Sequence, residues 1–270
     1  MLDSSSTCLM QRSAGVAEVT ISARGLRRLS QRGSAKALLP HVRGMPEIVF
    51  LNTSGGLTSG DRLTYKMTLE AGARAVATTQ AAERAYRADQ GMAEVDVHHR
   101  VGAHGWLDWL PQETILFDRA KLRRRTVIDL AAEAGCVMLE AVVLGRSAMR
   151  EVVTDLQFSD IREVRRGGKT ILIEPFVQNS DILALGARSA LLSDARAFAT
   201  MALCAKGAED AVETARRALD VEGVEGAASG FDGKCLVRLL AADAWPLRQQ
   251  ILKLMTVLRR GAPPPRVWQI

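Results

Sequence analysis

The stretch Leu51-Asn52-Thr53-Ser54-Gly55-Gly56-Leu57-Thr58-Ser59-Gly60-Asp61-Arg62 joins two segments with the character of β-strands. It follows the apolar run 48–51 and precedes the alternating run 64–69. Three glycines within six positions predict a backbone that adopts positive φ angles or passes close to other atoms. A phosphate-binding loop would have a different glycine spacing, would open a helix and would not end in a carboxylate such as Asp61. We therefore interpret the stretch as a tight loop between two strands.

A two-residue hydrophobic period recurs along most of the chain and predicts further β-strands. The segments that show strand character are 16–22, 74–79, 95–101, 106–110, 126–130, 157–165, 169–176 and 234–240. Residues 70–73, 102–105 and 167–168 contain glycine and predict hairpin turns between successive strands. Residues 167–170 resemble the end of a phosphate-binding loop, but the strand-like run that follows favours a hairpin turn.

Two segments depart from the simple alternation. Residues 136–144 are apolar on both faces except at Glu140, which predicts a central strand that is buried on both sides. Residues 80–87 are permissive for helix and predict a single helical turn.

A helical period appears only near the C-terminus. Apolar residues spaced along 212–219 predict a helix of about three turns. A second helix is predicted from an N-cap at Asp243 to a stop at Gly261. Its apolar stripe is formed by Leu247, Ile251, Leu254, Met255 and Leu258. The sequence thus predicts a mainly β, multi-stranded stacked β-sheet scaffold with two α-helices in its C-terminal part. Residues 1–14 are interpreted as a disordered tail and residues 15–270 as a single domain.

Composition narrows the classes of partner and the cellular location. The net charge is +6, yet only 4% of residues are aromatic and the basic residues are dispersed apart from 123–125, which argues against a nucleic-acid groove. No apolar run approaches the roughly 20 residues of a membrane span. No secretory signal is visible, so we expect a cytoplasmic protein whose scattered cysteines are reduced. These are Cys8, Cys136, Cys204 and Cys235.

Glu140 is the main chemical anomaly, because a lone charge on a buried strand is costly. One interpretation is an ion pair with an arginine such as Arg146 or Arg84. The other is a carboxylate that lines an internal polar path. The sequence leaves both open.

Three histidines lie close together at 98, 99 and 104. His98 and His99 point to opposite faces of a strand and cannot bind one ion together. His98 and His104 can meet across the 102–105 turn beside Asp96, although a solvated strand face is the simpler interpretation. No motif of a serine, cysteine or zinc hydrolase is present.

Five ordered blocks closely resemble the UreD (UreH) family of urease accessory proteins. They are residues 51–61, 78–87 (TTQAAERAYR), 109–117 (WLPQETILF), 144–149 (LGRSAM) with Glu151, and a C-terminal group of 231–234 (FDGK), 238–241 (RLLA) and 265–268 (PRVW). The resemblance covers nearly everything from about residue 15 onward. The family motif usually has glycine where Ser59 stands, and often glycine where Arg150 stands.

The resemblance implies a mainly β protein that is not itself an enzyme. It implies binding to apo-urease and to the accessory protein UreF, which recruits the GTPase UreG, and support for nickel delivery to urease. No cofactor is expected to remain bound, and nickel is expected in transit. We expect Asp61, Glu83 and Glu140 to form a transient nickel path, and we expect neither nucleic acid nor membrane as a partner. The rival hypothesis is a β-rich hydrolase that uses the carboxylates of Asp61, Glu83 and Glu113.

Overall fold

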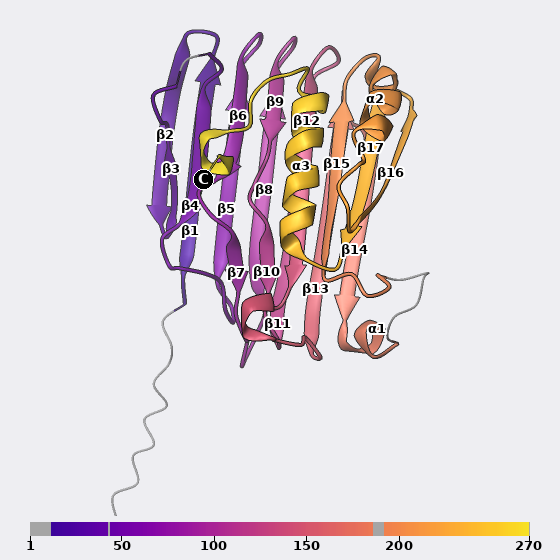
Figure 1. Ribbon diagram of the computed structural model, residues 1–270. Helices are drawn as coiled ribbons and strands as arrows, with labels where there is room; N and C mark the ends of the chain where they lie inside the picture. The colour runs from indigo at the N-terminus through magenta and orange to yellow at the C-terminus, as the bar shows by residue number, and fades with distance from the viewer. Residues whose placement is uncertain (1–11, 43, 186–191, 270) are drawn as a thin grey trace, which may run out of the picture.

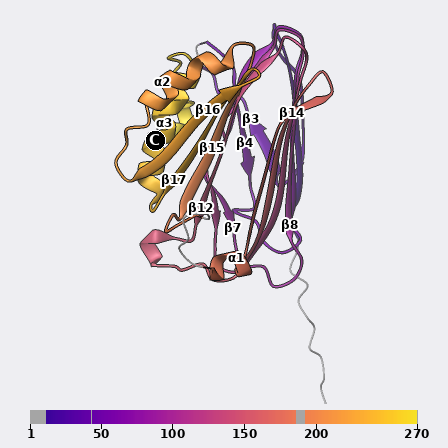
Figure 2. The ribbon, with the colours of Figure 1, turned by 90° about the vertical axis from the view of Figure 1, so that its right-hand side faces the viewer.

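Successive strands, or small groups of strands, alternate between two stacked β-sheets. The computed structural model describes residues 12–42, 44–185 and 192–269. Figure 2 shows the two sheets edge-on as separate layers, and Figure 1 shows the strands running side by side across the molecule. The prediction of a mainly β, stacked-sheet scaffold is confirmed.

The two sheets contain seven and ten strands. Sheet A has the spatial order β14 (Lys169–Asn179), β13 (Leu156–Arg166), β11 (Ala120–Leu130), β8 (Ala93–Val101), β5 (Arg62–Leu69), β1 (Ala14–Ser22) and β2 (Gly25–Gly33). Sheet B has the order β16 (Val224–Phe231), β17 (Lys234–Ala241), β15 (Ala197–Cys204), β12 (Gly135–Leu144), β9 (Trp106–Trp109), β6 (Arg74–Thr79), β4 (Glu47–Asn52) and β3 (Ala35–Leu38). The short strand β10 (Thr114–Leu116) extends sheet B by pairing with both β12 and β7 (Glu83–Ala85).

The alternation between sheets makes most neighbouring strands parallel. In sheet A, β5, β8, β11 and β13 are parallel neighbours, and in sheet B the same holds for β4, β6, β9 and β12. Residues 70–73 and 102–105 connect strands of different sheets, so the prediction of hairpin loops there is wrong. Turn residues specify that the chain reverses, but not whether the next strand pairs with the last or stacks on it. The turn at 167–168 is a true hairpin, because β13 and β14 pair antiparallel.

Two apolar cores follow from the side-chain period of the strands. The first lies between the sheets, where β5 contributes Leu63, Tyr65, Met67 and Leu69. The second lies between sheet B and the helices. Strand β12 is buried along its whole length because its two faces contribute to different cores, and the prediction of a doubly buried strand is confirmed.

The described residues contain three α-helices, and two of them cover the outer face of sheet B (Figures 1 and 2). These are α2 (Val212–Arg217) and α3 (Ala244–Leu258), whereas α1 (Ser180–Ala184) follows β14. The α2 helix has six residues, preceded by a 3-10 turn at Ala208–Ala211, so it is shorter than the predicted three turns.

The predicted bounds of α3 are confirmed by its caps. The carboxylate of Asp243 accepts a hydrogen bond from the Trp245 N–H at 2.8 Å. All five residues of the predicted apolar stripe are buried. Beyond the helix, the N–H of Gly261 donates to the carbonyl of Thr256, with Gly261 at a φ of 86°.

Other predictions have mixed outcomes. Residues 80–87 contain strand β7 rather than a helical turn, because pairing with β10 overrides a weak helical propensity. Ala14 belongs to β1, and residues 1–11 of the predicted tail lie outside the described residues, as does Cys8. Cys136, Cys204 and Cys235 are free thiols in the core, as expected. No helix in the described part of the chain is long and apolar enough to cross a membrane.

Candidate functional site

The glycine-rich loop is shaped by the side chain of Asn52 at the end of β4. The Asn52 side-chain amide donates to the Gly56 carbonyl at 3.1 Å, and its oxygen accepts from the Ser54 N–H at 3.0 Å. Gly55 and Gly56 have φ angles of 82° and 152°, so the predicted positive φ angles are confirmed. A Cβ atom on Gly56 would lie 2.3 Å from the ring of Tyr86, which leaves room only for glycine.

Asp61 closes the loop by accepting backbone hydrogen bonds. Its two carboxylate oxygens accept from the N–H groups of Ser13 at 2.7 Å and Thr58 at 2.9 Å. The side chain is buried and lines neither of the interior pockets described below. Asp61 therefore acts as a structural clasp of this loop.

The loop packs directly on the short strand β7. The N–H of Leu57 donates to the carbonyl of Arg84 at 2.7 Å, and the N–H of Tyr86 donates back to Leu57 at 2.8 Å. This docking brings the carboxylate of Glu83 to 3.3 Å from the Asn52 side-chain amide. Glu83 thus lies between the glycine-rich loop and the space between the two sheets.

Two adjoining pockets lead from this point into the space between the sheets. The outer one, of about 170 Å³, is lined by the glycine loop and by Glu83. The inner one, of about 40 Å³, is lined by Glu83, Arg124 and Glu140. Tyr65, Thr79 and Glu83 line both, so Glu83 stands at their junction.

Burial makes Glu83 a weaker acid than an exposed glutamate. Loss of solvent raises its pKa to about 7, against the lowering effects of the Asn52 hydrogen bond and the Arg124 charge. Burial also raises the pKa of Tyr65, with a further contribution from the Glu83 charge. The Glu83 carboxyl therefore changes its charge near neutral pH.

Glu140 belongs to a buried ionic network that joins the two sheets. One of its oxygens accepts from the Trp109 indole at 3.0 Å, and the other lies 3.0 Å from the guanidinium of Arg124. Arg124 in turn donates to both oxygens of Asp160, at 3.0 and 2.6 Å, and Asp160 also accepts from Arg162. Burial alone would raise the pKa of Asp160, but the two guanidinium groups hold it below its ordinary value.

The predicted ion pair at Glu140 is present, but with a different partner. Arg146 pairs with Glu151 at 2.8 Å, and Arg84 is exposed. Arg124 was missed, although it is the middle residue of the basic run 123–125. On a strand the middle of three residues points opposite to its neighbours, so at least one of the three arginines had to point inward.

The comparisons with known proteins decide the family. The model of the UreD urease accessory protein family matches residues 14–269. The chain belongs to the UreD family. A urease accessory protein UreD from Cereibacter sphaeroides is 58% identical over 265 residues, which cover 96% of each chain. One from Paracoccus denitrificans is 51% identical over 271 residues, covering 100% of this chain and 97% of that one. One from Jannaschia sp. is 44% identical over 271 residues, covering 100% of both chains.

Family membership confirms the resemblance seen in the sequence blocks. It assigns the chain to the maturation of urease, and to a family of accessory factors that are not themselves enzymes. The departure at Ser59 is accommodated, because its hydroxyl accepts from the Gln90 N–H at 3.1 Å. The frequent family glycine at 150 is also explained, since Arg150 has a φ of 52°.

Three of the five UreD blocks, 51–61, 78–87 and 109–117, contribute to the walls of the two pockets. Block 51–61 packs on block 78–87 through Leu57 and Asn52. Block 78–87 bonds block 109–117 through Thr78, whose hydroxyl donates to the Leu110 carbonyl at 2.6 Å. That carbonyl also accepts from the indole of Trp268 in the last block, at 3.0 Å. Three blocks thus build the pocket region, and Trp268 of the last block is bonded to it, whereas Asp232 and Gly233 of the block 231–234 border a different cleft.

The carboxylates of the rival hydrolase have different partners. Asp61 closes the loop, Glu83 faces the interior, and Glu113 pairs with Arg248 at 3.5 Å. No arrangement of three acid–base groups results among the described residues.

The histidines have different surroundings. His98 bonds Asp129 on the neighbouring strand β11 at 2.6 Å, and His104 lies in a turn at a φ of 56°. His99 is buried among aromatic rings, and burial lowers its pKa to about 3. Within the described residues, no group of three or more His, Cys, Asp or Glu side chains comes together as a metal site.

Proposed function

We propose that this UreD protein binds apo-urease and UreF in the cytoplasm, that UreF brings the GTPase UreG, and that the assembly delivers nickel to urease. Nickel is the cargo of this process, not a resident cofactor. The observation that carries the nickel part is the pair of adjoining pockets with Glu83 at their junction and Glu140 at the inner end. The family blocks that build these pockets support the same proposal.

The chemistry of Glu83 suits an ion in transit. A carboxyl whose pKa is about 7 exchanges a proton for a divalent cation with a small change in pH or hydration. Carboxylates hold nickel less tightly than thiolates do, so the ion is released again. The three free cysteines of the core line neither pocket, so none of these three thiols competes for the ion there.

The test removes charge from the pocket while keeping shape. Glu83→Gln and Glu140→Gln are each co-expressed with the urease subunits and the other accessory proteins, and urease is recovered for nickel analysis. The matched control is Glu94→Gln. Glu94 is a residue of β8 that lines neither pocket, and it forms ion pairs with Arg123 and Arg62. We expect all three variants to bind urease and UreF in a pull-down, and the Glu83 variant to load less nickel than the control.

Two outcomes would contradict the proposal. Full nickel loading with both pocket variants would exclude a carboxylate route through these pockets. Loss of complex formation with Glu83→Gln would assign Glu83 to structure. Asp61→Ala is a poor test of transport, because Asp61 holds the backbone of the loop.

A further inference from the structure

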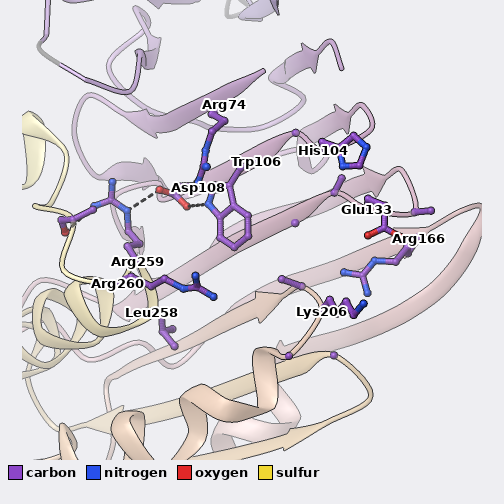
Figure 3. Close-up of a pocket in the computed structure, with 18 of the residues that line it drawn as sticks. Arg74, His104, Trp106, Asp108, Glu133, Arg166, Lys206, Leu258, Arg259 and Arg260 are labelled. Carbon is purple, nitrogen blue, oxygen red and sulfur yellow. Dashed lines mark hydrogen bonds and ion pairs between the residues drawn. The ribbon is translucent and has the colours of Figure 1, made fainter. Parts of the chain in front are cut away.

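A larger cleft lies at the other end of the sheets and takes no part in the function proposed above. The glycine loop precedes β5, whereas this cleft is bordered by Arg74 and His104, beyond the far ends of β5 and β8 (Figure 1). Its volume is about 780 Å³, in the range of ligand-binding pockets. The turns after β11 and β15 and the segment after α3 complete its walls (Figure 3).

Two charged residues of the cleft, Asp108 and Arg259, form an ion pair with each other. The carboxylate of Asp108 accepts from the Trp106 indole at 2.7 Å and from Arg259 at 2.8 Å, as the dashed lines in Figure 3 show. The other cationic side chains form no ion pair with any carboxylate among residues 12–42, 44–185 and 192–269. They are Arg74, Arg166, Lys206 and Arg260.

Arg166, at the end of β13, is the most unusual of these cations. Its Nε and Nη2 atoms are buried and have no hydrogen-bond acceptor in the described part of the protein. A buried donor without a partner is costly, and a buried charged donor more so. The Nε–Nη2 edge is also the edge with which arginine binds both oxygens of a carboxylate or phosphate. The geometry therefore points to an oxyanion supplied from outside the chain.

The rest of the lining selects the kind of oxyanion. Glu133, Glu209 and Asp232 border the same cleft, and their carboxylates need hydrogen-bond donors, which the phosphate groups of a nucleotide do not offer. The ring of Trp106 gives a nucleotide base no free face, since Arg74 lies 5.7 Å from its centre on one side. On Gly135, a Cβ atom would lie 2.5 Å from the same ring. A peptide suits a mixed lining better, because its N–H groups can face the acidic residues.

We propose that this cleft binds an acidic peptide segment of a partner protein. One Asp or Glu carboxylate of the segment accepts two hydrogen bonds from Arg166, and neighbouring carboxylates pair with Lys206 and Arg260. In Figure 3 these three side chains reach toward the cleft from different elements. The inference does not depend on the nickel path, and nickel loading is not its readout.

The test measures binding of a fluorescent, end-blocked hexaglutamate peptide to the purified chain by anisotropy at low salt. Arg166→Lys keeps the charge but removes the two-donor edge, and we expect it to raise the Kd about tenfold. The matched control is Arg32→Lys on the exposed strand β2, for which we expect an unchanged Kd. Because Arg166 has no hydrogen-bonding partner for Nε or Nη2 in the chain, we also expect Arg166→Lys to leave the melting temperature unchanged.

Several results would overturn this proposal. Equal affinity of the Arg166 variant and the control would mean non-specific attraction to a basic protein. A lower melting temperature for Arg166→Lys would make Arg166 a structural residue. Inorganic phosphate or ATP displacing the peptide at concentrations below those of free hexaglutamate would identify a phosphate site instead.

Discussion

Replacing Arg124 by methionine tests how charge is balanced between the two sheets. Arg124 is buried, donates two hydrogen bonds to Asp160 and one to Thr114, and forms an ion pair with Glu140. The network of Arg124, Arg162, Glu140 and Asp160 is neutral as a whole. Without Arg124 it contains two carboxylates and one guanidinium, so one buried negative charge lacks a partner.

We expect Arg124→Met to lower the free energy of unfolding by about 3–5 kcal/mol, which is typical for breaking a buried ion pair by removing one partner. The measurement is urea unfolding at neutral pH, followed by circular dichroism. A loss of this size is a large fraction of the stability of an ordinary domain, so a folded variant should show a clearly lower midpoint.

A second substitution separates charge balance from simple loss of contacts. Adding Glu140→Met to Arg124→Met leaves only Asp160 and Arg162, which pair with one another at 2.7 Å. We expect the double variant to be more stable than Arg124→Met by about 1–3 kcal/mol, because replacing both partners of a buried ion pair leaves no uncompensated charge. If the double variant is instead less stable than Arg124→Met, the charge-balance reasoning is refuted and the contacts themselves carry the stability.

Two further predictions concern the mouth of the pockets. The pKa of Glu83, raised by burial to about 7, lies above its value in the unfolded chain, so the folded state loses stability as pH rises from about 4.5 to about 7. Glu83→Gln should therefore be more stable than the natural protein by about 1–3 kcal/mol at pH 8, and the gain should shrink toward pH 5 in thermal melts. An equal gain at both pH values would show that its ionisation is irrelevant. Gly56→Ala should destabilise the loop by about 1–3 kcal/mol, because the added Cβ meets Tyr86 and the carbonyl of Arg84. Gly55→Ala is the matched control, since its Cβ would meet nothing within 4 Å, and equal losses in urea unfolding would contradict a packing role for Gly56.

Local signals in the sequence predicted the elements well but not their layering. Strand β12 could be placed from a continuous apolar run and α3 from its N-cap at Asp243, because both signals are local in the sequence. The parallel arrangement depends on contacts between strands that are far apart in sequence, such as β5 and β8, which are separated by two strands of the other sheet. Residues 70–73 and 102–105 carry the same glycine signals in either arrangement, so periodicity alone could not distinguish hairpins from sheet-to-sheet turns.

The candidate site was predicted only in part, because some of its features are local in the sequence and others depend on contacts between distant segments. Glu140 stood out because a charge interrupted an apolar strand, and an ion pair was one of the two interpretations that elementary electrostatics offered. The identity of its partner required the register between sheets, which no local pattern contains. The cleft around Arg166 was invisible in the sequence, because its lining comes from segments far apart along the chain.

The contacts also rank the three carboxylates that the sequence proposed for nickel. Asp61 accepts two backbone N–H groups, so an ion there would have to break the loop. Glu140 is held by Trp109 and Thr126 and pairs with Arg124, so an ion would have to displace a guanidinium whose charge already balances the network. Glu83 forms no close ion pair among the described residues; it accepts a long hydrogen bond from the Asn52 side chain and one from the Arg84 backbone, and it ionises near neutral pH. A cation therefore meets the least competition at Glu83, and Glu83→Gln should reduce nickel loading more than Glu140→Gln does.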